Sequence, residues 1–391
     1  MAKVRMIGDE ERRARLVRRH ALDRGAADVV AMVRGVVALH SSDPLTPHLA
    51  AWARVPGYST EHLDHALTET RSLWRLHAMR RTLFVVPAEE APVFDAAAGR
   101  SVAEKERRRM EGWVKDEIGG RSVGRWLASL EAEVLSALSD GQAWRTQDLS
   151  KAVPRLATTI TLGSGKWQQR APLASRLLFV MAMEGKIVRG LPAGSWRSSQ
   201  YRWAAAEPWF DGGFERIDEA EGRRALAERY LASHGPVTTT DLKWWTGWTA
   251  RATQRALQET EAVPVALADG GEGWVLPNDQ APVARAKGVA LLPGLDPTPM
   301  GWKDRGFYLG EHGDPLFDRN GNVGPTIWVD GRVVGGWAQR SDGEVVVRLL
   351  EDVGRSAKRA VEARAAELGA WLDGVVTTPR FRTPLERELS A

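Results

Sequence analysis

The sequence predicts an α+β protein in which three tandem winged-helix units are followed by a small antiparallel β-barrel. Two patterns support this prediction. Groups of helical segments followed by a pair of β-prone runs recur along the chain as far as Leu276. After about Pro282, short β-prone runs separated by Asp-Gly turns replace them. A chain of 391 residues is long enough for about two to four domains. We expect the domains to be residues 1–118, 119–212, 213–280 and 281–391.

The first unit is predicted to hold several helices and one pair of strands. Apolar residues recur with helical spacing over 10–20, 28–39, 46–54, 61–70 and 89–113, and the stretch 73–86 is β-prone in its second half. Asp28 is a typical N-cap for the second helix, and Pro87 ends the β-prone stretch. Helices followed by a strand pair are typical of a helix-turn-helix with a wing.

The second and third units repeat this order. In the second unit we expect helices over 124–138 and 172–184, a helix that opens at 146–149, and strands over 187–189 and 200–203. In the third we expect helices over 221–234 and 250–259, a helix that opens at 239–242, and strands over 263–268 and 273–276. Thr146 should cap its helix, and Leu149 should enter the core. The helix 172–184 is the candidate recognition helix, and the hairpins 187–203 and 263–276 are the candidate wings.

The last part of the chain changes character. Strands are predicted over 289–292, 326–329, 333–337 and 345–349, with Asp-Gly turns between the last three. An amphipathic helix is expected over 355–372, and the tail after Gly374 is polar and predicted to be extended. We therefore expect a small, mostly antiparallel β domain.

Composition excludes several kinds of site. The chain is 43% hydrophobic and 27% charged, which is ordinary for a globular protein, and its 54 Lys+Arg and 50 Asp+Glu leave a net charge of +4. Arg outnumbers Lys, which suits phosphates and bases, although a GC-rich genome would produce the same bias. Without cysteine there are no disulfides, thiolate metal sites or cysteine nucleophiles. With no apolar run near ~18 residues and no signal-peptide core, we expect a cytoplasmic protein.

One bend gathers groups that can move a proton. His40, Ser41, Ser42 and Asp43 follow an apolar run, and Pro44 then disfavours a continuing helix. An imidazole, a hydroxyl and a carboxylate held at a bend can position water and exchange a proton. The structural alternative is that Ser42 or Asp43 only caps the helix that follows.

Other motifs are less specific. The stretch 163–166 lacks the spacing of a phosphate loop, and His62 and His65 share a helix face without a third metal ligand nearby. The run 291–297 places Asp296 on a double-proline turn, and 302–305 sets Lys303 and Arg305 around one acid. A turn with a surface ion pair is the structural alternative for both.

Four segments of the chain resemble the AlkZ/YcaQ-like DNA glycosylases. They run in family order over residues 37–54, 74–86 with the core Met79-Arg80-Arg81-Thr82-Leu83, 238–245, and 291–305. The resemblance implies three winged-helix units and a C-terminal β-barrel. It also implies excision of N7-alkylated purines and unhooking of interstrand crosslinks, without a metal or a nucleotide. The family's Gln-x-Gln or Gln-x-Asp signature falls on His40 and Ser42, which Asp43 follows.

We therefore predict a monofunctional DNA glycosylase that acts on double-stranded DNA as a monomer, with no cofactor and no metal. The predicted catalytic residues are His40, Ser42 and Asp43. The predicted DNA-binding residues are Arg80, Arg81, Lys303 and Arg305, placed along one basic surface. An N7-alkylated purine is already a good leaving group, so the site must stabilise an oxocarbenium-like sugar and aim a water. The alternative is a non-enzymatic DNA-binding protein or transcriptional regulator, which should be a symmetric dimer reading a palindrome.

Overall fold

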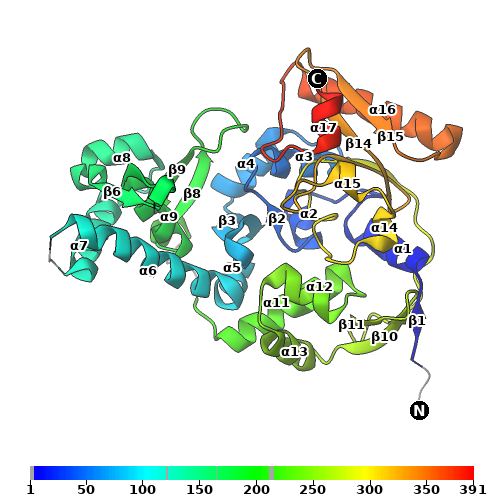
Figure 1. Cartoon of the computed structure of the whole chain (residues 1–391), viewed down its shortest axis with the longest axis horizontal. Helices are drawn as coiled ribbons and strands as arrows, with labels where there is room; N and C mark the ends of the chain where they lie inside the picture. Colours follow the sequence, from blue (N-terminus) through cyan, green and yellow to red (C-terminus); the bar gives the residue numbers. More distant parts are fainter. Residues whose placement is uncertain (1–3, 120–121, 164, 211–214) are drawn as a thin grey trace. The chain divides into compact units, whose positions relative to one another are not determined.

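The computed structural model describes residues 4–119, 122–163, 165–210 and 215–391 (Figure 1). Over these residues the chain is a mixed α+β protein. It divides into two compact units, of which unit 1 joins Met1–Leu63 to Arg223–Ala391 and unit 2 is Asp64–Gly222. Ser164 of the glycine-rich stretch and the boundary predicted at 212–213 lie outside the described residues. Among the helices that the structure describes, none has the length and apolar content needed to cross a bilayer.

The N-terminal part of unit 1 is mostly helical (Figure 1). Its elements are β1 (Met6–Ile7), α1 (Asp9–Arg19), α2 (Val29–Gly35), β2 (Leu39–His40), α3 (Leu45–Arg54) and α4 (Thr60–Thr68), whose last residues enter unit 2. Helix α1 begins with three acidic residues and ends with two arginines, which complements the helix dipole at both ends.

Helix α2 is shorter than the sequence predicts. Its N-cap is confirmed, because the Asp28 carboxylate accepts a hydrogen bond from the Ala31 amide at 2.8 Å. The prediction that it continues to Leu39 is wrong, since it ends at Gly35. A Cβ on Gly35 would lie 2.9 Å from the Arg19 carbonyl oxygen, so glycine is required where α2 packs against the end of α1. Val37 then turns the chain with a φ of 68°, and the backbone becomes extended at β2.

The second part of unit 1 begins with three helices and a hairpin. These are α11 (Glu219–His234), which starts in unit 2, α12 (Thr239–Thr246), α13 (Ala250–Glu259), β10 (Val263–Leu267) and β11 (Glu272–Val275). Thr238 and Asp241 form a capping box at the start of α12. Strands β10 and β11 pair antiparallel, so the hairpin predicted over 263–276 is confirmed. Strand β1 adds to this hairpin in parallel, opposite Ala266 and Leu267.

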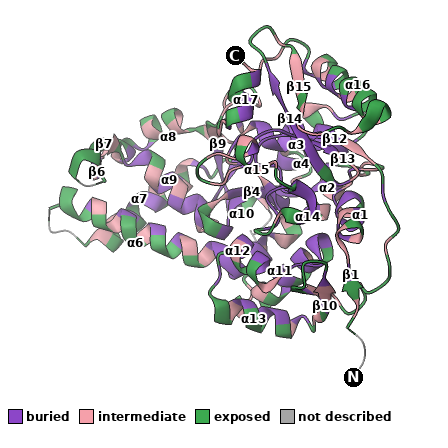
Figure 2. Ribbon diagram, turned by 45° about the vertical axis from the view of Figure 1, so that its right-hand side comes forward, coloured by how far each residue is buried: buried purple, intermediate pink, exposed green. Residues whose placement is uncertain are grey.

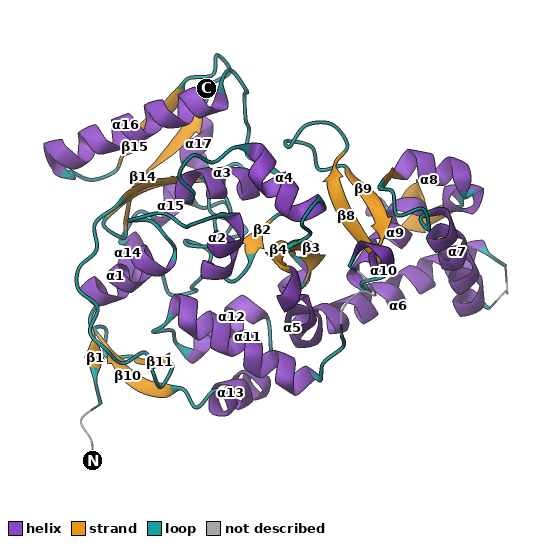
Figure 3. Ribbon diagram, turned by 180° about the vertical axis from the view of Figure 1, so that it is seen from behind, coloured by secondary structure: helices purple, strands orange, loops and turns teal. Residues whose placement is uncertain are grey.

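The C-terminal part of unit 1 is built on an open antiparallel sheet in the order β12-β13-β14-β15. Figure 3 shows its strands β14 and β15 near α16 and α17. Its elements are β12 (Val289–Leu292), α14 (Gly306–Leu309), α15 (Gly313–Leu316), β13 (Thr326–Val329), β14 (Arg332–Gln339), β15 (Val345–Leu349), α16 (Gly354–Leu372) and α17 (Pro384–Leu389). The four strands are confirmed, but a closed barrel is not found among the described residues. Helix α16 packs along β12 and β15, the two edge strands. The tail is not extended throughout, because it ends in α17, which packs on β14.

The described residues of unit 2 form three hairpins, and the long helix α6 is seen in Figure 1. Its elements are β3 (Leu73–His77), β4 (Leu83–Pro87), α5 (Ala91–Phe94), α6 (Arg100–Glu117), α7 (Val123–Ala137), β5 (Trp144–Arg145), α8 (Thr146–Ala152), β6 (Thr159–Leu162), β7 (Gln169–Pro172), α9 (Ala174–Met183), β8 (Ile187–Pro192), β9 (Tyr201–Ala205) and α10 (Ala206–Trp209). The hairpin β8–β9 confirms the strand pair predicted over 187–203 and stands next to α9 in the chain.

Two local predictions in unit 2 need correction. Thr146 begins α8, but it does not cap the helix with its side chain; its hydroxyl accepts a hydrogen bond from the Trp203 indole at 2.9 Å. The hairpin β6–β7 was not predicted at all. Only Ile160 and Leu162 mark it in the sequence as inward-facing residues, and this is too short a pattern to separate from a loop.

An apolar cluster packs the elements of unit 2 from α6 to β9 against one another. It joins Met110 and Val114 of α6 to Leu149 of α8, Leu177 of α9 and Ile187 of β8, all with almost no exposed surface. Figure 2 shows buried residues along α6 and α9. Burying each such side chain contributes roughly 1.5–3 kcal/mol. The prediction that Leu149 enters the core is therefore confirmed.

Candidate active site and DNA-binding residues

The predicted catalytic bend lies in unit 1 between β2 and α3. Exposure alternates along it: His40 and Ser42 are half-buried, whereas Ser41 and Asp43 are buried, with relative exposures of 1% and 3%. Strand β2 ends at His40, and the chain bends at Ser42 and Asp43. Two of the three predicted catalytic groups, His40 and Ser42, are thus accessible on the same chain segment.

A hydrogen bond within the bend assigns the tautomer of His40. The Ser42 backbone amide donates to His40 Nδ1 at 3.3 Å. A ring nitrogen that accepts a hydrogen bond carries no hydrogen, so the neutral imidazole holds its hydrogen on Nε2. In this state Nε2 can donate to a water oxygen or to a lesion, but it cannot take a proton from water.

Asp43 turns into the protein. Its Oδ1 accepts a hydrogen bond from the Leu45 amide at 3.0 Å, and its Oδ2 accepts one from the Arg380 amide at 2.8 Å. Burial raises the pKa of the Asp43 carboxyl above its ordinary value, while the two amide bonds and the Arg380 charge act against this rise. This geometry favours the interpretation in which Asp43 shapes the bend and the start of α3.

Arg380 is a residue of the bend that the sequence did not indicate. It lies in the tail between α16 and α17 and is exposed. Besides its amide bond to Asp43, its Nη1 donates to the Ser42 carbonyl oxygen at 3.4 Å. A cation therefore lies beside Ser42 and Asp43, held there by a hydrogen bond between residues 337 positions apart.

The double-proline turn around Asp296 holds α3 in place. Both Asp296 oxygens accept hydrogen bonds from the Arg54 guanidinium, at 2.7 and 2.8 Å, and neither side chain has exposed surface. Thr46 of α3 also donates to the Gly294 carbonyl oxygen at 2.7 Å. Asp296 is therefore one half of a buried ion pair, which differs from the surface ion pair considered for this turn. Removing one partner of such a pair costs about 3–5 kcal/mol.

Arg80 and Arg81 lie at the tip of the β3–β4 hairpin in unit 2. Both are exposed, and both have left-handed backbone, with φ values of 52° and 64°. The Thr82 amide closes this turn onto the Met79 carbonyl oxygen at 3.0 Å. Two left-handed residues in succession are typical of a type I′ turn, where Asn and Gly are preferred. Two arginines in that place indicate that their side chains serve a purpose other than turn stability. Arg81 also pairs with Glu106 at 3.1 Å.

Lys303 and Arg305 belong to unit 1, so the four predicted DNA-binding cations fall in two units. Lys303 is exposed, and its amide donates to the buried Asp241 carboxylate at 2.9 Å. Arg305 is half-buried, and its guanidinium lies over the rings of Trp244 and Phe317, at 5.1 and 4.7 Å from their centroids. Arg305 is therefore packed between aromatic rings, while Lys303 presents its charge to solvent.

Unit 2 contains a strong segregation of charge that the overall net charge conceals. From Leu149 to Ala206 the acidic side chains are limited to Glu184, whereas the cations in this stretch are Lys151, Arg155, Lys166, Arg170, Arg176, Lys186, Arg189, Arg197 and Arg202. Glu184 itself is paired with Arg107 and Lys186. This stretch covers the second half of α8, all of α9 and both hairpins β6–β7 and β8–β9. Clustered basic residues of this kind are typical of proteins that bind nucleic acids. Counting charged residues in a moving window along the sequence would have found this cluster.

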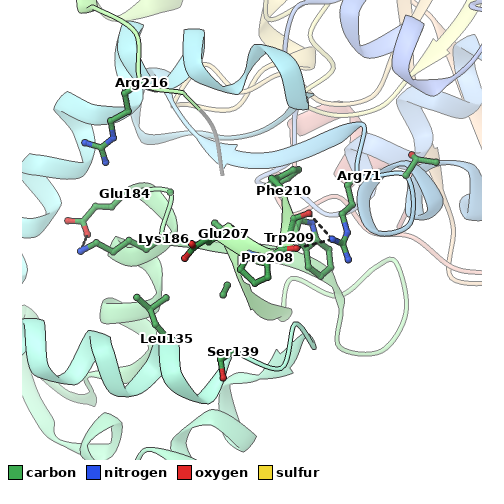
Figure 4. A pocket seen from close by; sticks show the side chains of 14 residues that line it. Arg71, Leu135, Ser139, Glu184, Lys186, Glu207, Pro208, Trp209, Phe210 and Arg216 are labelled. Atoms are coloured by element: carbon green, nitrogen blue, oxygen red, sulfur yellow. Dashed lines mark hydrogen bonds and ion pairs between the residues drawn. The ribbon is translucent and has the colours of Figure 1, made fainter. Parts of the chain in front are cut away.

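A cavity of about 1140 Å³ in unit 2 is less suited to a polyanion (Figure 4). Two of its cations are already engaged: Arg71 donates to the Trp209 carbonyl oxygen at 2.8 Å and lies over the Trp209 ring, and Lys186 pairs with Glu184 at 2.9 Å. Glu207 also lines it. We assign it no role in DNA binding.

The described residues contain no group of three or more His, Asp or Glu side chains placed to hold a metal ion. His62 accepts a hydrogen bond from the Ser59 amide at 3.2 Å, which fits a local role in its helix.

Comparison with known proteins agrees with this fold. A family model described as "DNA glycosylase AlkZ-like" matches residues 33–371. The "Interstrand DNA cross-link repair glycosylase" of Streptomyces sahachiroi is 26% identical over 324 residues, which cover 79% of this chain and 81% of that protein. The solved structure of Streptomyces sahachiroi DNA glycosylase AlkZ superposes with a TM-score of 0.69 at 20% identity and covers 93% of this chain and 97% of its own. Because the family model spans most of the sequence, the chain belongs to the AlkZ-like DNA glycosylase family.

Proposed function

We propose that this chain is a monofunctional DNA glycosylase that excises N7-alkylated purines and unhooks interstrand crosslinks, with the bend at 40–43 placed at the reacting sugar. One observation carries the proposal: His40 and Ser42, at the two positions of the family's Gln-x-Gln signature, are the accessible residues of the bend. The relative named as a cross-link repair glycosylase supports the choice of substrate. A purely DNA-binding regulator is not favoured, because the family is one of glycosylases.

The chemistry needs little acid catalysis. An N7-alkylated purine departs as a neutral base when the bond from N9 to C1′ breaks and its electron pair passes to N9. Water then adds to C1′ of the oxocarbenium-like sugar and loses its proton to solvent. The residues must therefore hold the water and stabilise positive charge on the sugar.

Each residue of the bend has a role in this scheme. His40 donates from Nε2 to the water oxygen or to the lesion, and the Ser42 hydroxyl holds the same water. Asp43 supplies negative charge from behind the bend and fixes its shape through the Leu45 and Arg380 amides. The exposed Arg380 guanidinium binds a phosphate that flanks the lesion.

The substrate is double-stranded DNA, bound by a monomer. Arg80, Arg81 and Lys303 contact phosphates, and Arg305 supports the surface that carries Lys303. The hairpins β3–β4, β8–β9 and β10–β11, each preceded by helices, act as the wings of three winged-helix units. The open C-terminal sheet takes the place of the barrel, and the protein works in the cytoplasm.

The direct test is release of a modified base. Purified protein is incubated with methylated duplex DNA, and free 7-methylguanine is measured by mass spectrometry. We expect release by the wild-type protein and a loss of release in the double variant His40→Ala/Ser42→Ala, which should still bind DNA. If the wild-type protein binds alkylated DNA without releasing any base, the proposal is refuted and the regulator becomes the better interpretation.

A further inference from the structure

Trp167 lies at the tip of the β6–β7 hairpin, and its side chain is exposed to solvent. Its relative exposure is 87%, and among the large apolar residues of the described part of the chain only Val4, Met6 and Trp167 are exposed. Val4 and Met6 lie near the N-terminus, whereas Trp167 lies inside a folded unit. An exposed tryptophan in a folded unit indicates a binding site, because burying an aromatic side chain against a partner is strongly favourable.

The hairpin is anchored well enough to hold this indole outward. Ile160 and Leu162 of β6 have 0% and 5% exposure and belong to the apolar cluster of unit 2. Strand β7 pairs with β6 along its whole length, from Thr159 opposite Pro172 to Leu162 opposite Gln169. The strands are therefore fixed to the core, and only their tip projects.

The described residues of the tip, which are 163 and 165–168, show two features of its backbone. Gly163 has a φ of 77°, and a Cβ at this position would lie 2.5 Å from the Trp167 carbonyl oxygen. The Gln168 amide donates to the Gly165 carbonyl oxygen at 3.1 Å, which closes the turn that contains Trp167. Glycine at 163 thus lets the chain fold back on itself, so the tip presents Trp167 in a preformed turn.

The positive charge around the tip indicates what kind of partner Trp167 contacts. Lys166 and Arg170 flank Trp167, and both are exposed. From Leu149 to Met183 the sequence contains no acidic residue. The carboxylate of Glu117, at the end of α6, accepts a hydrogen bond from the Thr161 hydroxyl at 3.0 Å. Thr161 lies within strand β6 and not at the tip. A flat aromatic face between two cations without an acidic neighbour in the sequence matches a nucleobase with its neighbouring phosphates.

We propose that the β6–β7 tip is a stacking finger in which Trp167 stacks on an unpaired base of the DNA substrate, while Lys166 and Arg170 contact the phosphates on either side. The proposal rests on the function proposed above, because it takes DNA as the partner. Bases inside an intact duplex already stack on one another, so the finger favours DNA in which a base has been displaced, unpaired or left opposite a lesion.

The test compares the affinity of the full-length protein for three labelled oligonucleotides by fluorescence anisotropy. These are an intact duplex, the same duplex with a central run of unpaired thymines, and a single strand. We expect Trp167→Ala to weaken binding to the second and third by about 5- to 100-fold and to the intact duplex by less than about 2-fold. Trp167→Phe should recover most of the loss, and Met6→Ala, which removes another exposed apolar side chain, should change nothing. The double variant Lys166→Gln/Arg170→Gln should make binding less dependent on salt.

The possible outcomes separate this proposal from the function itself. If wild-type protein releases 7-methylguanine but Trp167→Ala binds all three oligonucleotides as the wild type does, the finger is refuted and the glycosylase stands. Equal weakening on all three oligonucleotides also refutes base stacking. If Trp167→Ala instead converts a dimer into a monomer in sedimentation, the tip contacts a second copy of the chain and the proposal is overturned. If wild-type protein binds none of the oligonucleotides and releases no base, both the stacking finger and the proposed function are refuted.

Discussion

The Asp43 carboxylate accepts a hydrogen bond from the Arg380 backbone amide at 2.8 Å, although the two residues are 337 positions apart in the sequence. Asp43 also accepts a bond from the Leu45 amide at the start of α3. The tail between α16 and α17 is therefore tied to the bend that carries His40 and Ser42. The same carboxylate can shape the site and supply charge to it, and variants can separate these two roles.

We expect Arg380→Pro to lower the free energy of unfolding by about 1.5–3 kcal/mol, because proline lacks the N–H that donates a hydrogen bond to the buried Asp43 carboxylate. Arg380→Ala keeps this N–H and should cost less than about 0.5 kcal/mol. Urea unfolding of both variants measures the difference. Equal losses would show that the amide bond contributes nothing to stability. Arg380→Ala should instead weaken DNA binding, since it removes the exposed guanidinium.

Asp43→Asn tests whether the charge itself matters. Asparagine has one acceptor oxygen and would place an NH₂ group against one of the two backbone amides, so some stability is lost as in Arg380→Pro. If the carboxylate also stabilises the positive sugar, single-turnover excision should fall by about 10²-fold or more while DNA affinity stays nearly unchanged. If the excision rate of Asp43→Asn falls no further than that of Arg380→Pro, Asp43 has only its structural role.

His40→Ala should lower the excision rate by less than Asp43→Asn. His40→Gln is the informative companion, because it returns the residue that the family signature places there. Single-turnover rates of both variants on one alkylated duplex would decide. An unchanged rate in His40→Ala would exclude the imidazole from the reaction.

Local signals in the sequence predicted most of the elements. The N-cap at Asp28 and the hairpin over 263–276 depend on residues only a few positions apart, and both are present in the structure. The end of α2 could not be predicted in this way. It depends on the close approach of Gly35 to the Arg19 carbonyl oxygen, which only the packing of two helices creates.

The site was predicted less completely than the fold. The sequence predicted a helix up to Leu39, whereas the structure has a short strand at Leu39 and His40 and then a bend. Arg380 had no local motif, because its link to Asp43 depends on the return of the tail across the C-terminal sheet. Arg305 resembled a free cation in sequence, but the rings of Trp244 and Phe317 enclose it.

The β3–β4 turn offers a test in which stability and binding should change in opposite directions. Replacing Arg80 with Asn and Arg81 with Gly installs the pair that a type I′ turn prefers, so we expect a gain of about 1 kcal/mol in the free energy of unfolding. The same double variant should bind duplex DNA less tightly, and the slope of log affinity against log salt should fall by about 1 for each phosphate that the variant no longer neutralises. Arg359→Gln, at an exposed site on α16, is the control. Unchanged affinity would remove both arginines from the DNA-binding surface.

The last prediction concerns a buried histidine in unit 1. His234 stacks on Tyr230 with ring centroids 4.7 Å apart. Burial, with a smaller effect of the Arg19 charge, lowers the pKa of His234 to about 3. The folded state therefore keeps this ring neutral, while the unfolded chain protonates it below about 6.5. Stability from this group is complete above that pH and is lost as the pH falls toward 3. Between pH 7.5 and 4.5 the loss should be about 2–3 kcal/mol.

The variant His234→Phe keeps an aromatic ring against Tyr230 but removes the titrating group. We will measure its free energy of unfolding by urea titration at several pH values. Between pH 7.5 and 4.5 this free energy should fall by about 2–3 kcal/mol less than that of the wild type. His20 is also buried with a pKa lowered well below its ordinary value, so part of the acid sensitivity should persist in the variant. His62→Gln, at an exposed position of α4, should leave the wild-type dependence unchanged. Parallel pH curves for the wild type and His234→Phe would mean that His234 gains access to protons without unfolding, because a group that is protonated equally in both states contributes nothing to the slope.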